Sequence, residues 1–331
     1  MKVENIAYAC VTRFVESGEG NREALHWVDT DLTESSYSFE YFDREASRVA
    51  TILRQLGVTQ GDTVSIFIPR SPILISVFFG IQKALGISCI LFGTLGEEGL
   101  LDRLSNSNAK VVITRKSLLR KILAIKDKLP ALQKILTIDH DDHQSDTVLS
   151  LKKLMAETKA VFDYPHMVDG ETPAFLQYTS GSTGKPKGAL HAHGALEDMR
   201  QSFRDIMQLE AEDLYWCTAD PAWITGIVYG VLAPFGTGTR QVQYSGTYNA
   251  DNWLKILENL KVNIWYTAPT ALRMLMQEDE NKFSQYDFSS LKRMYSVGEP
   301  LNPEIYHWGK KVFKVEIYDT WWQSETGSMM I

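Results

Sequence analysis

A ten-residue loop, Thr179–Gly188, contains the residues of this chain that are best suited to bind an anion. It reads Thr-Ser-Gly-Ser-Thr-Gly-Lys-Pro-Lys-Gly and follows an apolar run, Pro173–Tyr178, that predicts a buried strand. Glycines let backbone N–H groups crowd around an anion, hydroxyls donate further hydrogen bonds, and lysines add positive charge. The loop therefore predicts a polyphosphate site where the edge of a sheet opens.

The spacing of the loop excludes the Walker A motif of P-loop NTPases. That motif needs a glycine five residues before its Gly-Lys pair, and a Ser or Thr after the lysine. Here Thr179 occupies the glycine position and Pro186 follows Lys185. The phosphate site is thus predicted to belong to another class of nucleotide-binding protein.

Residues 178–188, which read YTSGSTGKPKG, resemble the phosphate-loop signature of the adenylate-forming enzymes. This family contains acyl-CoA synthetases, luciferases and the adenylation domains of peptide synthetases. Two further segments, Trp216–Gly226 and Asp319–Gly327, resemble acetyl-CoA synthetases more than the family at large. The resemblance extends from about Ala7 to the last residue, and three motifs in this order argue against a Gly/Ser-rich surface loop.

The resemblance implies a reaction in which a carboxylate attacks the α-phosphate of ATP, pyrophosphate leaves, and coenzyme A then takes the acyl group. It implies that Lys187 and Glu325 are catalytic, that Ser324 contacts phosphate, and that Glu325 binds Mg²⁺, a hard cation that prefers oxygen ligands. The residues that it assigns to the β- and γ-phosphates, besides Lys187, are Thr179, Ser180, Gly181, Ser182, Thr183 and Gly184.

The same resemblance assigns the walls of three further subsites. The expected adenine side consists of Gly298, Glu299, Pro300, Asp319, Thr320 and Trp321. The expected acyl pocket consists of Trp223, Ile224, Thr225, Val297 and Trp322. A looser alignment assigns Phe92, Gly93 and Arg120 to the coenzyme A nucleotide.

The predicted size of the acid depends on Trp322. At the position of residues 321–325, synthetases for longer acids have a segment similar to Tyr-Gly-Gln-Thr-Glu. The resemblance therefore implies that the indole of Trp322 replaces a small glycine and fills the far end of the acyl pocket. We therefore expect acetate as the substrate, with propionate or another short acid as the alternative. Ile224 stands where the acetate enzymes commonly have valine, which narrows the pocket further. The paired tryptophans argue against a peptide-synthetase module.

Composition limits the class of protein. The chain has 331 residues, of which 44% are hydrophobic and 23% charged, as in soluble globular proteins. No apolar run is long enough to span a bilayer, the N-terminus has no apolar signal core, and three separated cysteines form no metal or redox pair. We expect a cytoplasmic protein with small-molecule substrates and no membrane partner. A net charge of −7 argues against a general nucleic-acid role.

Short apolar strands alternate with amphipathic helices along the chain, which predicts an α/β fold with mainly parallel sheets. The expected helices are Ser38 to Gly57, Ser71 to Gly86, Asp251–Leu260 and Asn302–Val312. The expected strands, besides the one before the phosphate loop, are Thr63–Ile68, Ser88–Phe92, Lys110–Thr114, Lys134–Ile138, Val262–Tyr266, Arg293–Val297 and Val315–Tyr318.

The resemblance implies two stacked α/β lobes within the large N-terminal domain of an adenylate-forming enzyme. One lobe is expected over about residues 61–190, and the other over about 1–60 plus 194–331. Members of the family continue beyond the Glu-Thr-Gly motif into a small C-terminal domain that carries the adenylation lysine. We therefore expect these residues to be an N-terminal portion that is inactive by itself. A non-catalytic nucleotide-binding fragment is the alternative from another class.

Two histidine-containing segments resemble sites but have simpler interpretations. Residues 139–143, Asp-His-Asp-Asp-His, contain metal-ligand types in a polar run after a strand, and we expect a solvated loop there. His191 and His193 are expected to lie at the start of a helix, where packing or capping explains them better than phosphate binding.

Overall fold

The computed structural model describes residues 1–179 and 185–331, and the chain folds into two compact units. The first unit contains residues 1–21 and 39–196, and the second contains residues 22–38 and 197–331. This division differs from the lobe boundary expected near residue 60. Residues 39–60 belong to the first unit because α2 (Phe39–Gln55) packs along α3 (Pro72–Lys83) within it.

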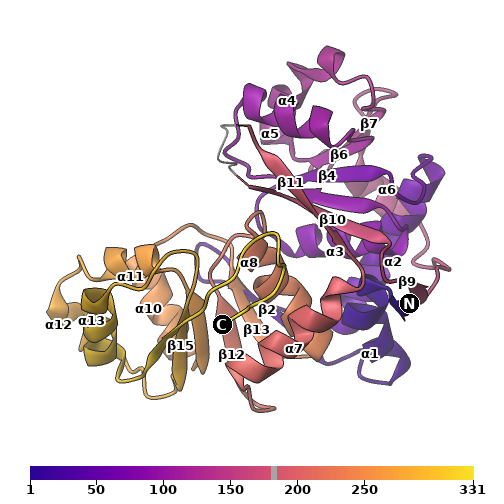
Figure 1. Ribbon diagram of the computed structural model, residues 1–331. Coiled ribbons are helices and arrows are strands. Elements are labelled where there is room, and N and C mark those ends of the chain that lie inside the picture. Colours follow the sequence, from indigo (N-terminus) through magenta and orange to yellow (C-terminus); the bar gives the residue numbers. More distant parts are fainter. Residues whose placement is uncertain (180–184) are drawn as a thin grey trace. The chain divides into compact units, whose positions relative to one another are not determined.

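A seven-stranded sheet forms the centre of the first unit, and its strands are parallel except for the antiparallel pair at one edge. Figure 1 shows α4 (Glu97–Asn106) and α5 (Lys116–Leu123) over one face, and α2 and α3 over the other. In spatial order the strands are β11 (Lys187–Ala192), β10 (Pro173–Thr179), β5 (Ile87–Ile90), β4 (Thr63–Phe67), β6 (Val111–Thr114), β7 (Lys134–Thr137) and β8 (Val148–Ser150).

Side chains on β10 alternate between the two faces of this sheet, as strand geometry requires. Tyr178 joins the apolar core that lies against α4 and α5, whereas Phe175 contacts Phe78 of α3. The remaining elements of the unit are β1 (Lys2–Glu4), the π-helical turn Tyr8–Thr12, α1 (Arg13–Glu16), the 3-10 turn Lys126–Lys128, α6 (Leu151–Glu157) and β9 (Met167–Asp169), which pairs with β1.

The contact between α2 and α3 is unusually close. A Cβ atom on Gly80 of α3 would lie 2.6 Å from Cβ of Val49 on α2, so only glycine permits this approach. Lys83, at the end of α3, is buried and donates hydrogen bonds to Oδ1 of Asp43 at 2.7 Å and to Oγ of Ser47 at 2.8 Å. Burial lowers the pKa of Lys83, and the nearby Asp43 carboxylate opposes that shift.

The second unit is built on the same plan, with a seven-stranded sheet that is parallel except for one edge pair, β2 and β3. In spatial order its strands are β16 (Ile317–Asp319), β15 (Arg293–Ser296), β14 (Ile264–Thr267), β12 (Leu214–Cys217), β13 (Arg240–Tyr244), β2 (Glu23–Val28) and β3 (Glu34–Ser38). Its helical segments are α7 (Ala195–Met207), α8 (Ile224–Ile227), the π-helical turn Val228–Leu232, α9 (Ala233–Thr237), α10 (Ala250–Asn259), α11 (Pro269–Leu275), α12 (Glu280–Phe283) and α13 (Pro303–Phe313).

The two faces of the second sheet carry different aromatic residues. Trp216 of β12 and Trp265 of β14 stack on the face covered by α10 and α13. The neighbouring residues on these strands, Tyr215 and Tyr266, point to the opposite face, where Phe203 of α7 meets Tyr215 edge-to-face. The site described below lies at the carboxyl end of this tyrosine face.

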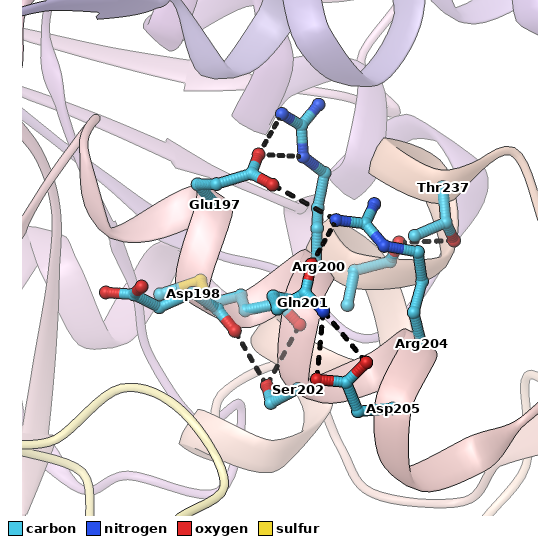
Figure 2. A network of polar contacts seen from close by, with 10 residues as sticks. Glu197, Asp198, Arg200, Gln201, Ser202, Arg204, Asp205 and Thr237 are labelled. Atoms are coloured by element: carbon cyan, nitrogen blue, oxygen red, sulfur yellow. Dashed lines mark hydrogen bonds and ion pairs between the residues drawn. The ribbon is translucent and has the colours of Figure 1, made fainter.

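A network of polar side chains lies along α7 (Figure 2). Glu197 accepts hydrogen bonds from Arg200 and Arg204, and Gln201 donates to the carboxylate of Asp205. Ser202 instead donates its hydroxyl hydrogen to the backbone oxygen of Asp198 at 2.8 Å. This leaves the Ser202 oxygen available as an acceptor.

The observed elements confirm the α/β fold with mainly parallel sheets. Each strand expected from an apolar run is present within two residues of its expected bounds. The placement of the two histidines was wrong, because His191 lies in β11 and His193 precedes α7 by two residues. Among the described residues, no helix combines the length and the apolar character that crossing a membrane requires.

Candidate functional site

The predicted phosphate loop connects β10 to β11 in the first unit. The strand expected before the loop is confirmed as β10, Thr179 is its last residue, and Thr179 pairs across the hairpin with Lys187, the first residue of β11. The Lys187 side chain is exposed at this point. The expected phosphate contacts Ser180, Gly181, Ser182, Thr183 and Gly184 lie outside the described residues.

The residues expected to contact coenzyme A lie on two neighbouring segments of the first unit. Phe92 and Gly93 follow β5, and Arg120 is exposed on α5. The residue next to it, Lys121, donates to the backbone oxygens of Gly93 at 3.3 Å and Leu95 at 2.8 Å. Lys121 therefore fixes the loop after β5 against α5, a structural role that the basic Arg-Lys pair did not reveal in the sequence.

The other candidate residues occupy one edge of the second sheet. The loops after β12, β14, β15 and β16 all leave the sheet at the carboxyl ends of adjacent parallel strands. Ligands of parallel α/β folds bind at this edge. The expected adenine-side and acyl-pocket residues lie in these loops or at the start of α8, except for Asp319, which is the last residue of β16.

Gly298 and Glu299 shape the loop after β15. Gly298 has a φ of +94°, a conformation that favours glycine because a Cβ atom strains it. The carboxylate of Glu299 accepts from the backbone N–H of Thr270 at 2.7 Å, and Arg273 lies 3.8 Å away. Glu299 thus caps the N-terminus of α11, where an anion is favoured by the helix dipole. Pro300 is exposed beside it.

Asp319 and Thr320 hold the neighbouring loops together. Oδ2 of Asp319 accepts from the backbone N–H of Leu301 at 3.1 Å. Thr320 is buried, and its hydroxyl donates to the backbone oxygen of Ser296 at 2.8 Å. The following residue, Trp321, is 54% exposed, so its indole is accessible beside these two polar residues.

The first segment assigned to the acyl pocket is held by close backbone packing. Ile224 and Thr225 are buried at the start of α8, whereas Trp223 is exposed. A Cβ atom on Gly226 would lie only 1.9 Å from the backbone oxygen of Asp220. The bend before α8 therefore packs directly onto the helix backbone, and glycine is required at 226 for this contact.

Trp322 is half-buried between two tyrosines of the second unit. Its indole N–H donates to the hydroxyl of Tyr266 at 3.3 Å, and its ring meets Tyr229 edge-to-face with a centroid distance of 5.0 Å. Tyr229 lies four residues beyond Thr225, and Val297 is buried directly after β15. The structure thus places Trp322, Thr225 and Val297 on segments that meet at the carboxyl edge of the sheet.

The two tyrosines were missed in the sequence because each lies in an apolar segment that predicts ordinary core packing. Both are fully buried. Burial raises the pKa of Tyr229 to about 12 and the pKa of Tyr266 well above its ordinary value. Both therefore keep the hydroxyl hydrogen near neutral pH. The available signal was the position of Tyr266 at the carboxyl end of a predicted strand.

Ser324 and Glu325 belong to a tight turn after Trp322. The backbone N–H of Gln323 donates to Oγ1 of Thr326 at 3.1 Å, and Gly327 follows with a φ of +71°. Ser324 is half-buried and the Glu325 side chain is exposed. An exposed carboxylate is a donor type that Mg²⁺ accepts, so the residue present fits the predicted metal role.

The two histidine-containing segments have structural roles. In the polar loop after β7, Lys152 and Lys153 pair with Asp141 and Asp142, and His143 accepts from the backbone N–H of Ser150. His193 is fully buried and accepts from the backbone N–H of Ile6 at 3.0 Å. Burial lowers the pKa of His193 to about 4. Packing therefore explains His193, as expected.

Comparison with known proteins gives consistent results for sequence and structure. The sequence model of a family described as AMP-binding enzyme matches residues 13–331. The acetyl-coenzyme A synthetase of Bacillus subtilis is 42% identical over 99% of this chain and 57% of its own length. That of Streptomyces coelicolor is 34% identical over 99% of this chain and 53% of its own length.

Two solved structures share the fold. An acyl-CoA synthetase of Brucella canis superposes with a TM-score of 0.90 at 27% identity, over 98% of this chain and 58% of that protein. An anthranilate–CoA ligase in complex with anthranoyl-AMP gives 0.89 at 26% identity, over 99% of this chain and 61% of that protein. The chain thus spans little more than half the length of these relatives.

Proposed function

The chain belongs to the AMP-binding enzyme family, and we propose that the protein activates acetate with ATP and transfers the acetyl group to coenzyme A. The observation that carries the choice of acetate is Trp322, which stands between Tyr229 and Tyr266 in the loop assigned to the acyl pocket. An indole at this place leaves room for a very short acid. The two curated relatives named above are acetyl-coenzyme A synthetases, which supports the same choice.

The proposed reaction has two steps. A carboxylate oxygen of acetate attacks the α-phosphorus of ATP, the bond to the bridging oxygen breaks, and pyrophosphate leaves. The thiol of coenzyme A then loses its proton and attacks the acyl carbon, and AMP leaves as a thioester forms. Both reactants of the first step are anions, so binding must offset their repulsion and align the attack.

The chain's own residues are proposed to divide this work. Lys187 and the loop after Thr179 neutralise the β- and γ-phosphates, and Glu325 holds Mg²⁺, which supplies positive charge to the triphosphate when bound. Gly298, Pro300 and Trp321 are proposed to line the adenine, with Glu299, Asp319 and Thr320 fixing the loops around it. The loop after β5 and Arg120 are proposed to meet the coenzyme A nucleotide.

A panel of acids with the full-length protein tests the proposal. Acetate, propionate, butyrate and anthranilate are each assayed for carboxylate-dependent exchange of labelled pyrophosphate into ATP, and for thioester formation with coenzyme A. We expect both activities with acetate at the highest kcat/KM, and AMP as the nucleotide product. A preference for propionate would move the assignment to the next acid. ADP and phosphate as products, or a preference for anthranilate, would overturn it.

A further inference from the structure

The hydroxyl of Tyr266 lies at the centre of a chain of hydrogen bonds whose direction is fixed by chemistry. Thr320 is 2.8 Å from the backbone oxygen of Ser296, which can only accept, so Thr320 must donate there. Its oxygen is 2.8 Å from the hydroxyl of Tyr266 and therefore accepts from it. Tyr266 in turn accepts from the indole N–H of Trp322. Each hydrogen has one acceptor.

Tyr229 is fixed in the same way on the other side of the indole. Ser202 donates its hydrogen to the backbone oxygen of Asp198, so the contact of 2.8 Å with Tyr229 has the tyrosine as donor (Figure 2 shows the Ser202 end). The Tyr229 oxygen accepts from the backbone N–H of Met329 at 2.6 Å. Tyr229 and Tyr266 also meet edge-to-face at 6.0 Å. The ring that contacts Trp322 is thus held at its hydroxyl end.

We infer that Tyr266 is a positioning residue for acyl-chain selectivity, which acts by fixing the indole of Trp322 through its hydroxyl group. This inference rests on the proposed function, because it assumes that Trp322 closes the acyl pocket. Tyr229 limits movement of the indole plane, and among the described residues the bond to Tyr266 is the polar contact that fixes the rotation of the indole toward the sheet. An indole without that bond is free to rotate and to admit a longer acid.

The test replaces Tyr266 by phenylalanine in the full-length protein, which keeps the ring and removes the hydroxyl. We expect kcat/KM for acetate to fall and that for butyrate to rise, so that their ratio changes about tenfold, the effect of one buried hydrogen bond. Tyr295→Phe is the matched control. Tyr295 is buried in register with Tyr266 on the next strand, but its hydroxyl donates to the backbone oxygen of Ile206 at 2.6 Å. We expect this control to leave the ranking of acids unchanged.

A double-mutant cycle with Trp322→Gly separates positioning from general damage. In the Trp322→Gly background, Tyr266→Phe is expected to leave the ratio of acetate to butyrate unchanged, because no indole remains to be positioned. An equal effect of Tyr266→Phe in both backgrounds would overturn the inference, as would an unchanged ratio in the single variant. If Trp322→Gly itself leaves the ranking unchanged, the proposed acyl pocket fails instead.

A second variant covers the case in which Tyr266→Phe does not fold. Trp322→Phe keeps an aromatic ring beside Tyr229 and removes the indole N–H. We expect Trp322→Phe to accept butyrate and to lower the ratio of kcat/KM for acetate to that for butyrate, as Tyr266→Phe does. Retention of the full acetate preference by folded Trp322→Phe would show that the hydrogen bond to Tyr266 has no role in selectivity.

Discussion

Three polar side chains assigned to the nucleotide site also hold the backbone that carries them. Glu299 caps α11, Asp319 accepts from Leu301, and Thr320 donates to Ser296. Substituting any of these residues would therefore change the shape of the site as well as its contacts. Lys187 and Glu325 are exposed, which makes them the better residues for testing the proposed roles in the reaction.

We predict that Lys187→Ala and Glu325→Gln, each made in the full-length protein, lower acetate-dependent pyrophosphate exchange by about 100-fold or more, the usual effect of removing one stabilising charge contact. Lys255→Ala, which removes an exposed lysine on α10 outside the candidate site, is the control and should have a much smaller effect. Acetyl-adenylate supplied directly should restore most thioester formation, because that step no longer releases pyrophosphate. Equal losses in both half-reactions would contradict these roles.

At the scale of elements, the start of α8 depends on one glycine. We predict that Gly226→Ala in the full-length protein displaces the bend at Asp220, lowers the free energy of unfolding by about 1–3 kcal/mol and reduces activity with acetate. Gly230→Ala is the matched control, since a Cβ atom there would meet Cys217 at an ordinary distance of 3.7 Å. Urea denaturation and acetate kinetics of both variants test this. Similar behaviour of the two would show that packing at Gly226 is unimportant.

The sequence predicted the central strands of the first sheet, but in the second sheet it predicted β14, β15 and β16 and missed β12, β13 and β2. It also missed the antiparallel edge strands of both sheets, β11 and β3. Central parallel strands are buried on both faces, so they read as continuous apolar runs. The edge strand β11 contains Lys187 and Gly188, and the edge strand β3 reads Glu-Ser-Ser-Tyr-Ser. Edge strands face solvent, and their polar residues prevent aggregation, so these strands do not read as apolar runs. The expected helical position of His191 was wrong for this reason, because His191 lies in β11.

The candidate site could be predicted only where a motif marks it. The phosphate loop, the Trp216–Gly226 segment and the Asp319–Gly327 segment are contiguous in sequence, and each lies where a strand ends. The support around Trp322 comes from Tyr229 and Tyr266, which lie far from it in sequence. Tyr266 belongs to β14, which strand pairing places near the end of β16, whereas Tyr229 belongs to the π-helical turn Val228–Leu232. Such long-range contacts have no local pattern.

At the scale of the whole molecule, the first unit is closed by contacts between its two ends. The N-terminal segment donates the backbone N–H of Ile6 to His193, which lies 187 residues later. Because this histidine is buried, its folded pKa of about 4 is below the ordinary value of 6.5. As the pH falls, His193 is therefore protonated in the unfolded chain before it is protonated in the folded chain. The free energy of unfolding is thus unaffected by this histidine above about pH 6.5 and decreases as the pH falls toward 4.

We predict that protonation of His193 lowers the free energy of unfolding by an amount on the order of 3 kcal/mol between about pH 6.5 and pH 4. His193→Asn keeps a side-chain acceptor for Ile6 and does not titrate, so it should be less sensitive to acid. The measurement is urea denaturation of both proteins at several pH values between 7.5 and 4.5. Parallel stability curves for the two proteins would show that His193 does not contribute.

The central claim, that Trp322 limits the acid to acetate, is tested most directly by the chain-length preference of Trp322→Gly in the full-length protein. Removing the indole opens space for several methylenes, each of which contributes about 0.8 kcal/mol at most when buried. We predict that kcat/KM falls for acetate and rises for butyrate and valerate, as a graded change of ranking. Trp321→Gly, the control, should raise KM for ATP and leave that ranking unchanged. A folded Trp322→Gly variant that still prefers acetate and gains nothing on longer acids would contradict the claim.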